Sequence, residues 1–228
     1  MLESLFAAFD PILVLDTETT GIRCRSDEII ELGFVRLSRE GERREEDYLL
    51  RLSPGRRLPP EIQRLTGISE NDLRERGVEK SVGAEALCAA LEGEAPLLAA
   101  YNAQFDLCFL YYFLQRLGRA EVLRKCRFLD VMAVYKDRRD YPHRLENAVG
   151  EYAVEGVNSH RASDDAAAAL AVLCAMERER DDIAAYVNLF GYNPKYGPPR
   201  PAIASIRYEP QPYDRRKLLY ESHNMDFG

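Results

Sequence analysis

The order of strand-like and helix-like segments constrains the fold of this chain more than any other feature. Short runs rich in aliphatic and β-branched residues are typical of buried strands, and apolar residues three or four apart are typical of helices. The strand-like segments are 12–16, 28–38, 44–53, 96–101 and 127–130. The helix-like segments are two short ones within 58–73, then 83–93, 103–117, 131–135, 144–154 and 163–180, with Ser163 as the expected N-cap of the last. Strands first, then strands alternating with helices, predict an α/β fold with a mixed sheet covered by helices.

The composition divides the chain into two parts. Of its 228 residues, 46% are apolar, which is ample for a substantial core. Beyond about Phe190, Pro, Tyr and Arg dominate and no long periodicity remains. We therefore expect one domain over 1–189 and a C-terminal arm over 190–228. Alternating rings and cations suit a track for a single nucleic-acid strand, but the composition favours an arm that packs on its own domain or on a second subunit.

Charge, cysteines and hydropathy exclude several classes of protein. A net charge of −7 argues against a protein that coats nucleic acid non-specifically. The five cysteines are scattered, with no closely spaced pair for a disulfide framework or a zinc site. No apolar run approaches the ~18 residues that span a bilayer, and the N-terminus has no basic start. We expect no membrane partner and a cytoplasmic location.

Two carboxylates stand at the end of the first strand-like run in the stretch VLDTETTG, Asp16 as its last residue and Glu18 two residues further on. Side chains two apart on a strand point to one face, so these acids are expected to project side by side. Like charges this close repel unless a cation lies between them, and a divalent metal supplies such charge. The pair alone is a weak signal, because a solvated strand end has the same pattern.

Two later motifs supply further candidates, again beside predicted strand or helix ends. In YNAQFD, Asp106 follows the strand-like segment 96–101 and enters a helix. The carboxyl ends of strands in α/β sheets collect ligand sites, although a first-turn acid is also favourable for a helix by itself. In HRASDDA, His160 precedes Asp164 and Asp165 at a helix start. Here too, acids in the first turn are favourable for the helix by themselves.

Together the three motifs resemble those of the His-type branch of the DEDD 3′→5′ exonuclease superfamily. These motifs are DTETTG, YNAQFD and HRASDDA, and the resemblance covers roughly residues 10–180. The branch includes the proofreading (epsilon) subunit of bacterial DNA polymerase III. The resemblance implies a ribonuclease H-like fold, a mixed five-stranded sheet flanked by helices, here with a Pro/Tyr-rich arm. It also implies a nuclease that hydrolyses phosphodiester bonds.

The same resemblance implies the roles of the catalytic residues. Asp16, Glu18, Asp106 and Asp165 would hold two divalent ions, Mg²⁺ or Mn²⁺, and hard oxygen ligands suit both. Asp16 would bridge the ions, with Glu18 and Asp165 on the nucleophile side and Asp106 on the other. His160 would be the general base. Asp164 fits the family spacing less well than its neighbour.

Further residues are implied to bind the 3′-terminal nucleotide. The backbone amides of 17–20 are expected to hold it, and two residues of the stretch IQRLTGIS are expected to wedge against its base. The expected substrate-binding residues are Thr17, Thr19, Thr20, Leu65, Thr66, Asn102 and Phe105.

Three functions remain open at this point. The leading one is a 3′→5′ exonuclease that releases nucleoside monophosphates from single-stranded 3′ ends of DNA, in proofreading or repair. A second is an exoribonuclease acting on RNA ends or short oligoribonucleotides, and a third is a non-catalytic interaction domain, which the intact acids weigh against. A proofreading role needs a DNA polymerase partner. The last residues, through Met225 and Phe227, are similar to sliding-clamp binding peptides, but Ser222 stands where those peptides have glutamine.

Overall fold

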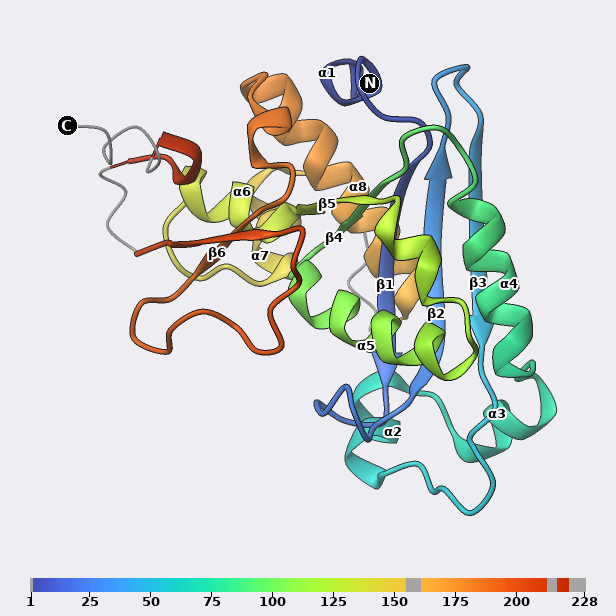
Figure 1. Ribbon diagram of the computed structural model, residues 1–228. Coiled ribbons are helices and arrows are strands. Elements are labelled where there is room, and N and C mark those ends of the chain that lie inside the picture. The colour runs from blue at the N-terminus through green and yellow to red at the C-terminus, as the bar shows by residue number, and fades with distance from the viewer. Residues whose placement is uncertain (1, 155–160, 213–216, 222–228) are drawn as a thin grey trace.

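The computed structural model describes residues 2–154, 161–212 and 217–221. A five-stranded sheet runs through the molecule in the order β3-β2-β1-β4-β5, with helices on both faces (Figure 1). The central strand β1 is antiparallel to β2 and parallel to β4, and β4 is parallel to β5, so the predicted mixed sheet is confirmed. The strands are β1 Ile12–Thr19, β2 Ile29–Leu37, β3 Arg43–Leu49, β4 Leu97–Ala100 and β5 Arg127–Asp130.

The helices divide between the two faces of the sheet. Helices α4 and α5 cover one face, and α6, α7 and α8 cover the other (Figure 1). The helices are α1 Glu3–Phe6, α2 Pro60–Thr66, α3 Glu70–Glu75, α4 Lys80–Ala90, α5 Ala103–Arg116, α6 Val131–Arg138, α7 Leu145–Glu151 and α8 Ala162–Glu179. Two 3₁₀ helices complete them, η1 Ala120–Arg124 and η2 Ile183–Tyr186.

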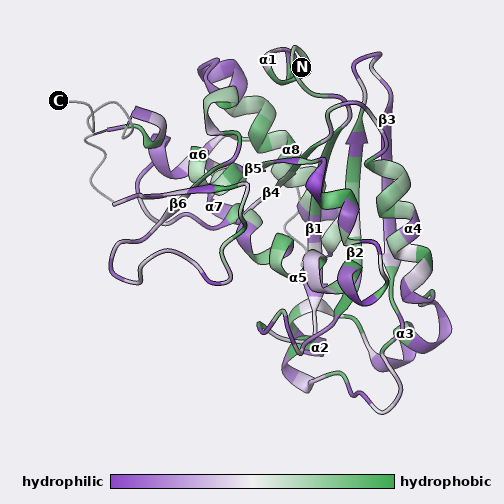
Figure 2. Cartoon of the chain, viewed as in Figure 1, coloured by the Kyte–Doolittle hydropathy of each residue, from purple (hydrophilic) through white to green (hydrophobic). Residues whose placement is uncertain are grey.

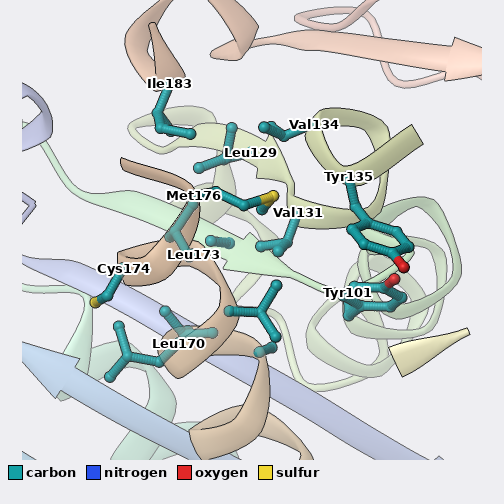
Figure 3. Close-up of a cluster of buried hydrophobic side chains, with 14 of the residues drawn as sticks. Tyr101, Leu129, Val131, Val134, Tyr135, Leu170, Leu173, Cys174, Met176 and Ile183 are labelled. Atoms are coloured by element: carbon teal, nitrogen blue, oxygen red, sulfur yellow. The ribbon is translucent and has the colours of Figure 1, made fainter. Parts of the chain in front are cut away.

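Successive side chains of β1 point to opposite faces of the sheet and pack into two separate apolar clusters. Ile12 and Val14 join the cluster under α8, whereas Leu13 and Leu15 join the cluster under α4 and α5. Figure 3 shows the first cluster, where side chains of α8 such as Leu173 point toward β5 and α6. The edge strand β3 is largely hydrophilic (Figure 2), which protects an open sheet edge from pairing with another chain.

Strand β1 is longer than the sequence predicts. It continues past Asp16 to Thr19, because pairing with β2 persists, with Asp16 opposite Gly33 and Glu18 opposite Glu31. Glu18 therefore lies inside the strand rather than after it, and Asp16 is no longer its last residue. By alternation they continue the face of Val14, which α8 covers.

The start of α8 also differs from expectation. Its N-cap residue is Arg161 and makes no side-chain cap, while Ser163, predicted as the cap, lies within the first turn. The first helical amide, that of Ala162, donates instead to a carboxylate oxygen of Glu31 on β2 at 2.9 Å. A sheet residue thus satisfies an amide that a local cap would otherwise serve.

The C-terminal arm docks on the domain that precedes it. Its strands β6 Leu189–Tyr192 and β7 Arg207–Pro210 form a small parallel sheet that the sequence did not predict, and β6 begins inside the expected domain range. The Tyr208 hydroxyl donates to the side-chain oxygen of Gln104 on α5 at 2.6 Å. The side-chain amide of Gln211 donates to the Ala133 carbonyl on α6 at 2.7 Å. Within the described part of the chain, no helix is both long and apolar enough to cross a bilayer.

Candidate active site

Three carboxylates from two elements meet beside the central strand. Asp16 and Glu18 come from β1, and Asp165 comes from the first turn of α8. One carboxylate oxygen of each lies within 4.8 Å of those of the other two. Asp165 is buried, whereas its neighbour Asp164 is exposed, so the structure separates the two acids that adjoin in sequence.

The helix carrying Asp165 reaches this position because β2 has no side chain where they meet. A Cβ atom on Gly33 would lie 2.2 Å from the Ser163 nitrogen and 2.3 Å from the Ala162 carbonyl carbon. Both are backbone atoms, which cannot rotate away as a side chain can. Gly33 also pairs with Asp16 across the sheet, so one glycine brings the helix backbone to the strand that bears the acids.

A salt-bridged cluster secures the same helix start. The Arg161 guanidinium donates to Glu31 through Nε at 2.7 Å and to Asp47 on β3 at 3.3 Å. Glu31 is fully buried, and its second carboxylate oxygen accepts from the Ala162 amide. The buried charge of Glu31 is therefore both paired and hydrogen-bonded, as a buried carboxylate requires.

Asp106 approaches the cluster from the other face of the sheet. It lies buried in the first turn of α5, and the Thr17 hydroxyl donates to it at 2.8 Å. Thr17 lies between Asp16 and Glu18 on β1 and points away from α8, toward α5. One strand thus supplies two acids on one face and the donor that holds a further acid on the other.

Burial and mutual repulsion raise the pKa values of these acids. Desolvation raises the pKa of Asp16 well above its usual value, and Asp106, Glu18, Asp165 and Glu31 raise it further. Desolvation also raises the pKa of Glu18 to about 8, with Asp165 and Glu31 adding to it and Arg161 opposing it. Without a compensating cation, this site favours bound protons.

Two further acids at the site are shifted in the same direction. Desolvation raises the pKa of Asp106 to about 7, although the hydrogen bond from Thr17 lowers it. Desolvation and the charge of Glu31 raise the pKa of Asp47 to about 6, against the lowering effect of Arg161.

The donor set fits divalent cations of the hard class. Oxygen ligands from carboxylates are those that Mg²⁺ and Mn²⁺ prefer. The three clustered oxygens are near enough to share one ion. A cation there would also remove the repulsion that raises these pKa values, since opposite charge favours the ionised form.

The residues expected to bind the terminal nucleotide differ in exposure and in the contacts they already make. Leu65 on α2 is 54% exposed, an apolar side chain open to a ligand. Thr66 is buried, and its hydroxyl donates to the Ile62 carbonyl. Phe105 on α5 is half-buried against Phe109, with ring centroids 4.9 Å apart. Asn102 is exposed at the start of α5 in the left-handed conformation, φ 66°.

Threonines 19 and 20 have local partners. The Thr19 hydroxyl donates to the Gly21 carbonyl at 2.6 Å, and that of Thr20 accepts from the Glu28 amide at 2.9 Å. The Thr20 amide itself donates to the Glu28 carbonyl at 2.9 Å. These bonds shape the turn after β1, and the Thr20 amide is therefore engaged within the protein.

Two expectations fall outside the described residues. His160, the expected general base, directly precedes the described residue Arg161. The segment with Met225 and Phe227, expected to resemble a clamp-binding peptide, follows the last described residue, Glu221.

Sequence reasoning missed the residues that support the acids. Gly33 and Glu31 lie outside the three motifs, and Arg161 lies within HRASDDA but was given no role there. The available signal was the pairing of the first two predicted strands, because it sets Glu31 opposite Glu18 and Gly33 opposite Asp16. That register could not be assigned before the lengths of both strands were known.

A mixed sheet with half-buried carboxylates on its central strand and buried ones on two helix starts suits a hydrolase that works with metal ions. The sequence profile of the Exonuclease family matches residues 13–173, and the chain belongs to that family. It is a 3′–5′ exonuclease by this membership, and the resemblance drawn from the motifs is confirmed.

Curated relatives come from bacterial replication proteins. The DNA polymerase III subunit epsilon of Treponema pallidum is 27% identical over 172 residues, which are 71% of this chain and 74% of the relative. The PolC-type DNA polymerase III of Thermotoga maritima is 30% identical over 157 residues, 68% of this chain but 11% of the relative. The chain therefore spans most of the first relative and a small part of the second.

Solved structures share the fold. Exonuclease I of E. coli, in a zinc-bound complex with single-stranded DNA, aligns with a TM-score of 0.69 at 19% identity. The alignment covers 78% of this chain and 42% of that one. The expected ribonuclease H-like arrangement of sheet and helices is thereby confirmed.

Proposed function

We propose that this protein is a divalent-metal-dependent 3′→5′ exonuclease that releases nucleoside monophosphates from DNA 3′ ends, in proofreading or repair. The observation that carries the proposal is the cluster of Asp16, Glu18 and Asp165, whose carboxylate oxygens lie within 4.8 Å of one another. An unneutralised cluster of this kind is unfavourable, so its presence at the central strand suits a site completed by cations. We assign the activity to residues 1–189 and treat 190–228 as its arm.

The residues of the site have distinct parts in this proposal. Asp16, Glu18 and Asp165 would hold one divalent ion, and Asp16 with Asp106 would hold a second. Two such ions, Mg²⁺ or Mn²⁺, would supply positive charge for the attacking water and for the leaving oxygen of the phosphodiester. Thr17 keeps the Asp106 carboxylate oriented and favours its ionised form, since its hydroxyl donates to it.

His160 is proposed as the general base that takes the proton of the attacking water. The proposal rests on its place in the motif HRASDDA, five residues before Asp165. An imidazole with an ordinary pKa near 6.5 accepts a proton at neutral pH.

The 3′-terminal base is proposed to lie between Leu65 and Phe105. An exposed leucine on α2 and a half-buried ring on α5 offer apolar contact to any base, which is sequence-tolerant. Thr17, Thr19, Thr20, Thr66 and Asn102 complete the proposed surroundings of the terminal nucleotide.

DNA is the proposed substrate because of the proteins to which this chain is similar. Its relatives carry the names of DNA polymerase III components, and exonuclease I was solved with single-stranded DNA. A polymerase is accordingly the proposed partner for a proofreading role. RNA ends remain the alternative substrate, and the assay below includes them.

The test compares single-stranded DNA and RNA of one sequence, labelled at either end, with Mg²⁺, Mn²⁺ or EDTA. We expect stepwise, metal-dependent shortening from the 3′ end, faster on DNA. Asp165→Asn should lower the rate about 100-fold or more, because it removes charge from the site. Asp164→Asn is the matched control, since this neighbour is exposed, and it should leave the rate within about twofold.

Each other outcome has a definite meaning. Faster loss of RNA would move the substrate class to RNA, and equal loss in the two variants would remove Asp165 from the site. No cleavage of either polymer with metal present would overturn the proposal.

A further inference from the structure

A hollow of about 450 Å³ opens between the start of α5, helix α6 and the loop of the arm that joins β6 to β7. The loop lies beside the start of α5 in Figure 1, where the arm is orange to red. We call this hollow the arm groove. The residues that line it and matter here are Asn102, Gln104, Lys136, Tyr192, Tyr196 and Arg200.

The arm groove adjoins the carboxylate cluster through α5. Asn102 lines the groove and directly precedes α5, while Asp106 lies one turn further along the same helix. Four residues of helix advance about 6 Å along the axis. A strand whose end lies at Asp106 therefore has the groove within reach of its next nucleotides.

Positive charge gathers at the groove. Lys136 and Arg200 line it, and Lys195 lies on the same loop of the arm. Desolvation raises the pKa of the Asp130 carboxyl, and Lys136 lies near enough to lower it. Lys195 and Arg200 have no ion pair with a carboxylate of the described residues. In a chain with a net charge of −7, two such cations on one loop suit an anionic ligand.

The one carboxylate that lines the groove is occupied by the protein. Asp130 is buried, and one of its oxygens accepts from the backbone amides of Asn102, Ala103 and Met132 at 3.0, 3.3 and 3.1 Å. These bonds cap the starts of α5 and α6, so Asp130 holds the walls of the groove together.

The groove also offers an open aromatic ring. Tyr196 is 77% exposed, and the Lys195 ammonium lies 5.4 Å from its ring centroid. A ring beside cations is the combination on which the bases and phosphates of a single strand bind. The arm presents this ring from a docked position, because Tyr208 is hydrogen-bonded to Gln104.

We propose that the arm groove binds the single DNA strand upstream of the 3′-terminal nucleotide, with Tyr196 stacking on a base and Lys195 and Arg200 contacting phosphates. The inference rests on the proposed function, because it takes the terminal nucleotide to lie at the carboxylates. Its consequence is that affinity depends on substrate length. Substrates too short to reach the arm gain nothing from it.

The first test measures binding without catalysis. Fluorescence anisotropy of a 5′-labelled 15-mer of deoxythymidine is recorded in EDTA over a range of salt concentrations. Tyr196→Ala should weaken binding about 5- to 150-fold, the range for loss of one stacked base. Lys195→Ala/Arg200→Ala should lower the slope of log affinity against log salt by about 1.4, since each phosphate contact on a single strand contributes about 0.7.

A charge-matched control separates the groove from general attraction. Lys125→Ala/Arg178→Ala removes the same charge from two exposed positions outside the groove. Lys125 directly follows η1, and Arg178 lies near the C-terminal end of α8. This double variant should leave the slope near that of the unmodified protein. Equal effects of the two double variants, or no effect of Tyr196→Ala, would overturn the proposal.

The second test measures cleavage of a dinucleotide and of the 15-mer. The arm variants should raise KM for the 15-mer and leave the dinucleotide unchanged. Equal losses on both lengths would assign the arm to support of the catalytic site and overturn the proposal. If the unmodified protein cleaves neither but the binding results hold, the groove stands and the proposed function fails.

Discussion

The raised pKa values of the acidic cluster predict that the metal-free protein loses stability as the pH rises. Glu18 has a pKa of about 8 in the folded chain, against 4.5 as its ordinary value. Between these values the folded state binds more protons than the unfolded state does. The stability that the protonated Glu18 contributes is therefore complete below about pH 4.5 and is lost as the pH rises through about 8.

The size of the effect follows from the same values. At about 1.4 kcal/mol for each pKa unit, the rise at Glu18 corresponds to about 5 kcal/mol. Glu18 keeps partial contact with solvent, so we expect a measured loss of about 2–5 kcal/mol between pH 5 and pH 9. Asp106, with a pKa of about 7, adds to the loss in the same window. Such a loss is a large share of the stability of a typical domain.

The assay is urea unfolding followed by circular dichroism in EDTA at pH 5, 7 and 9. Glu18→Gln should flatten the profile, because the amide does not titrate, whereas Glu92→Gln, at an exposed carboxylate, should not change it. Adding Mg²⁺ or Mn²⁺ at pH 9 should restore stability, because an ion that binds only the folded state shifts the equilibrium toward it.

Two results would refute this reasoning. One is a metal-free stability that stays constant or rises between pH 5 and pH 9. The other is a pH profile of Glu18→Gln that matches the unmodified protein, since the loss would then arise elsewhere.

Three further changes probe how the site is built. Gly33→Ala should cost about 3 kcal/mol in urea unfolding, because its Cβ meets only backbone atoms, and a cost under about 0.5 kcal/mol would contradict the close approach. Thr17→Val should lower kcat/KM about 10- to 100-fold by removing the donor to Asp106, while Thr17→Ser should retain most activity. Arg161→Ala should cost about 3 kcal/mol, because it leaves Glu31 buried without its partner, and Glu31→Gln in the same chain should recover part of the loss.

Much of the sheet was predictable because its signal is local. The five strand segments and most helices follow from apolar periodicity. The extension of β1 past Asp16, through Glu18 to Thr19, was not predictable in this way. Acids in a strand have poor local propensity, and the pairing with β2 overrides it.

The candidate acids were found from motifs, but their support was not. Asp16, Glu18 and Asp165 meet as the motifs implied, and exposure distinguishes Asp165 from Asp164. The helix cap was misassigned to Ser163 because the true partner of the first amide, Glu31, lies 131 residues earlier in the sequence. Two four-residue strands in the arm were missed because segments that short carry too little pattern.

The contact between α8 and β2 has a consequence for how the site comes into being during synthesis. Asp16 and Glu18 leave the ribosome early, yet Asp165 joins them only after α8 has been made and its first amide has reached Glu31, 131 residues away in the chain. Contacts so distant in sequence form late, because the intervening chain must first be ordered. A nascent chain that has not yet docked α8 therefore carries Asp16 and Glu18 without Asp165 beside them, and the three-carboxylate cluster is complete only once the long-range contact has formed.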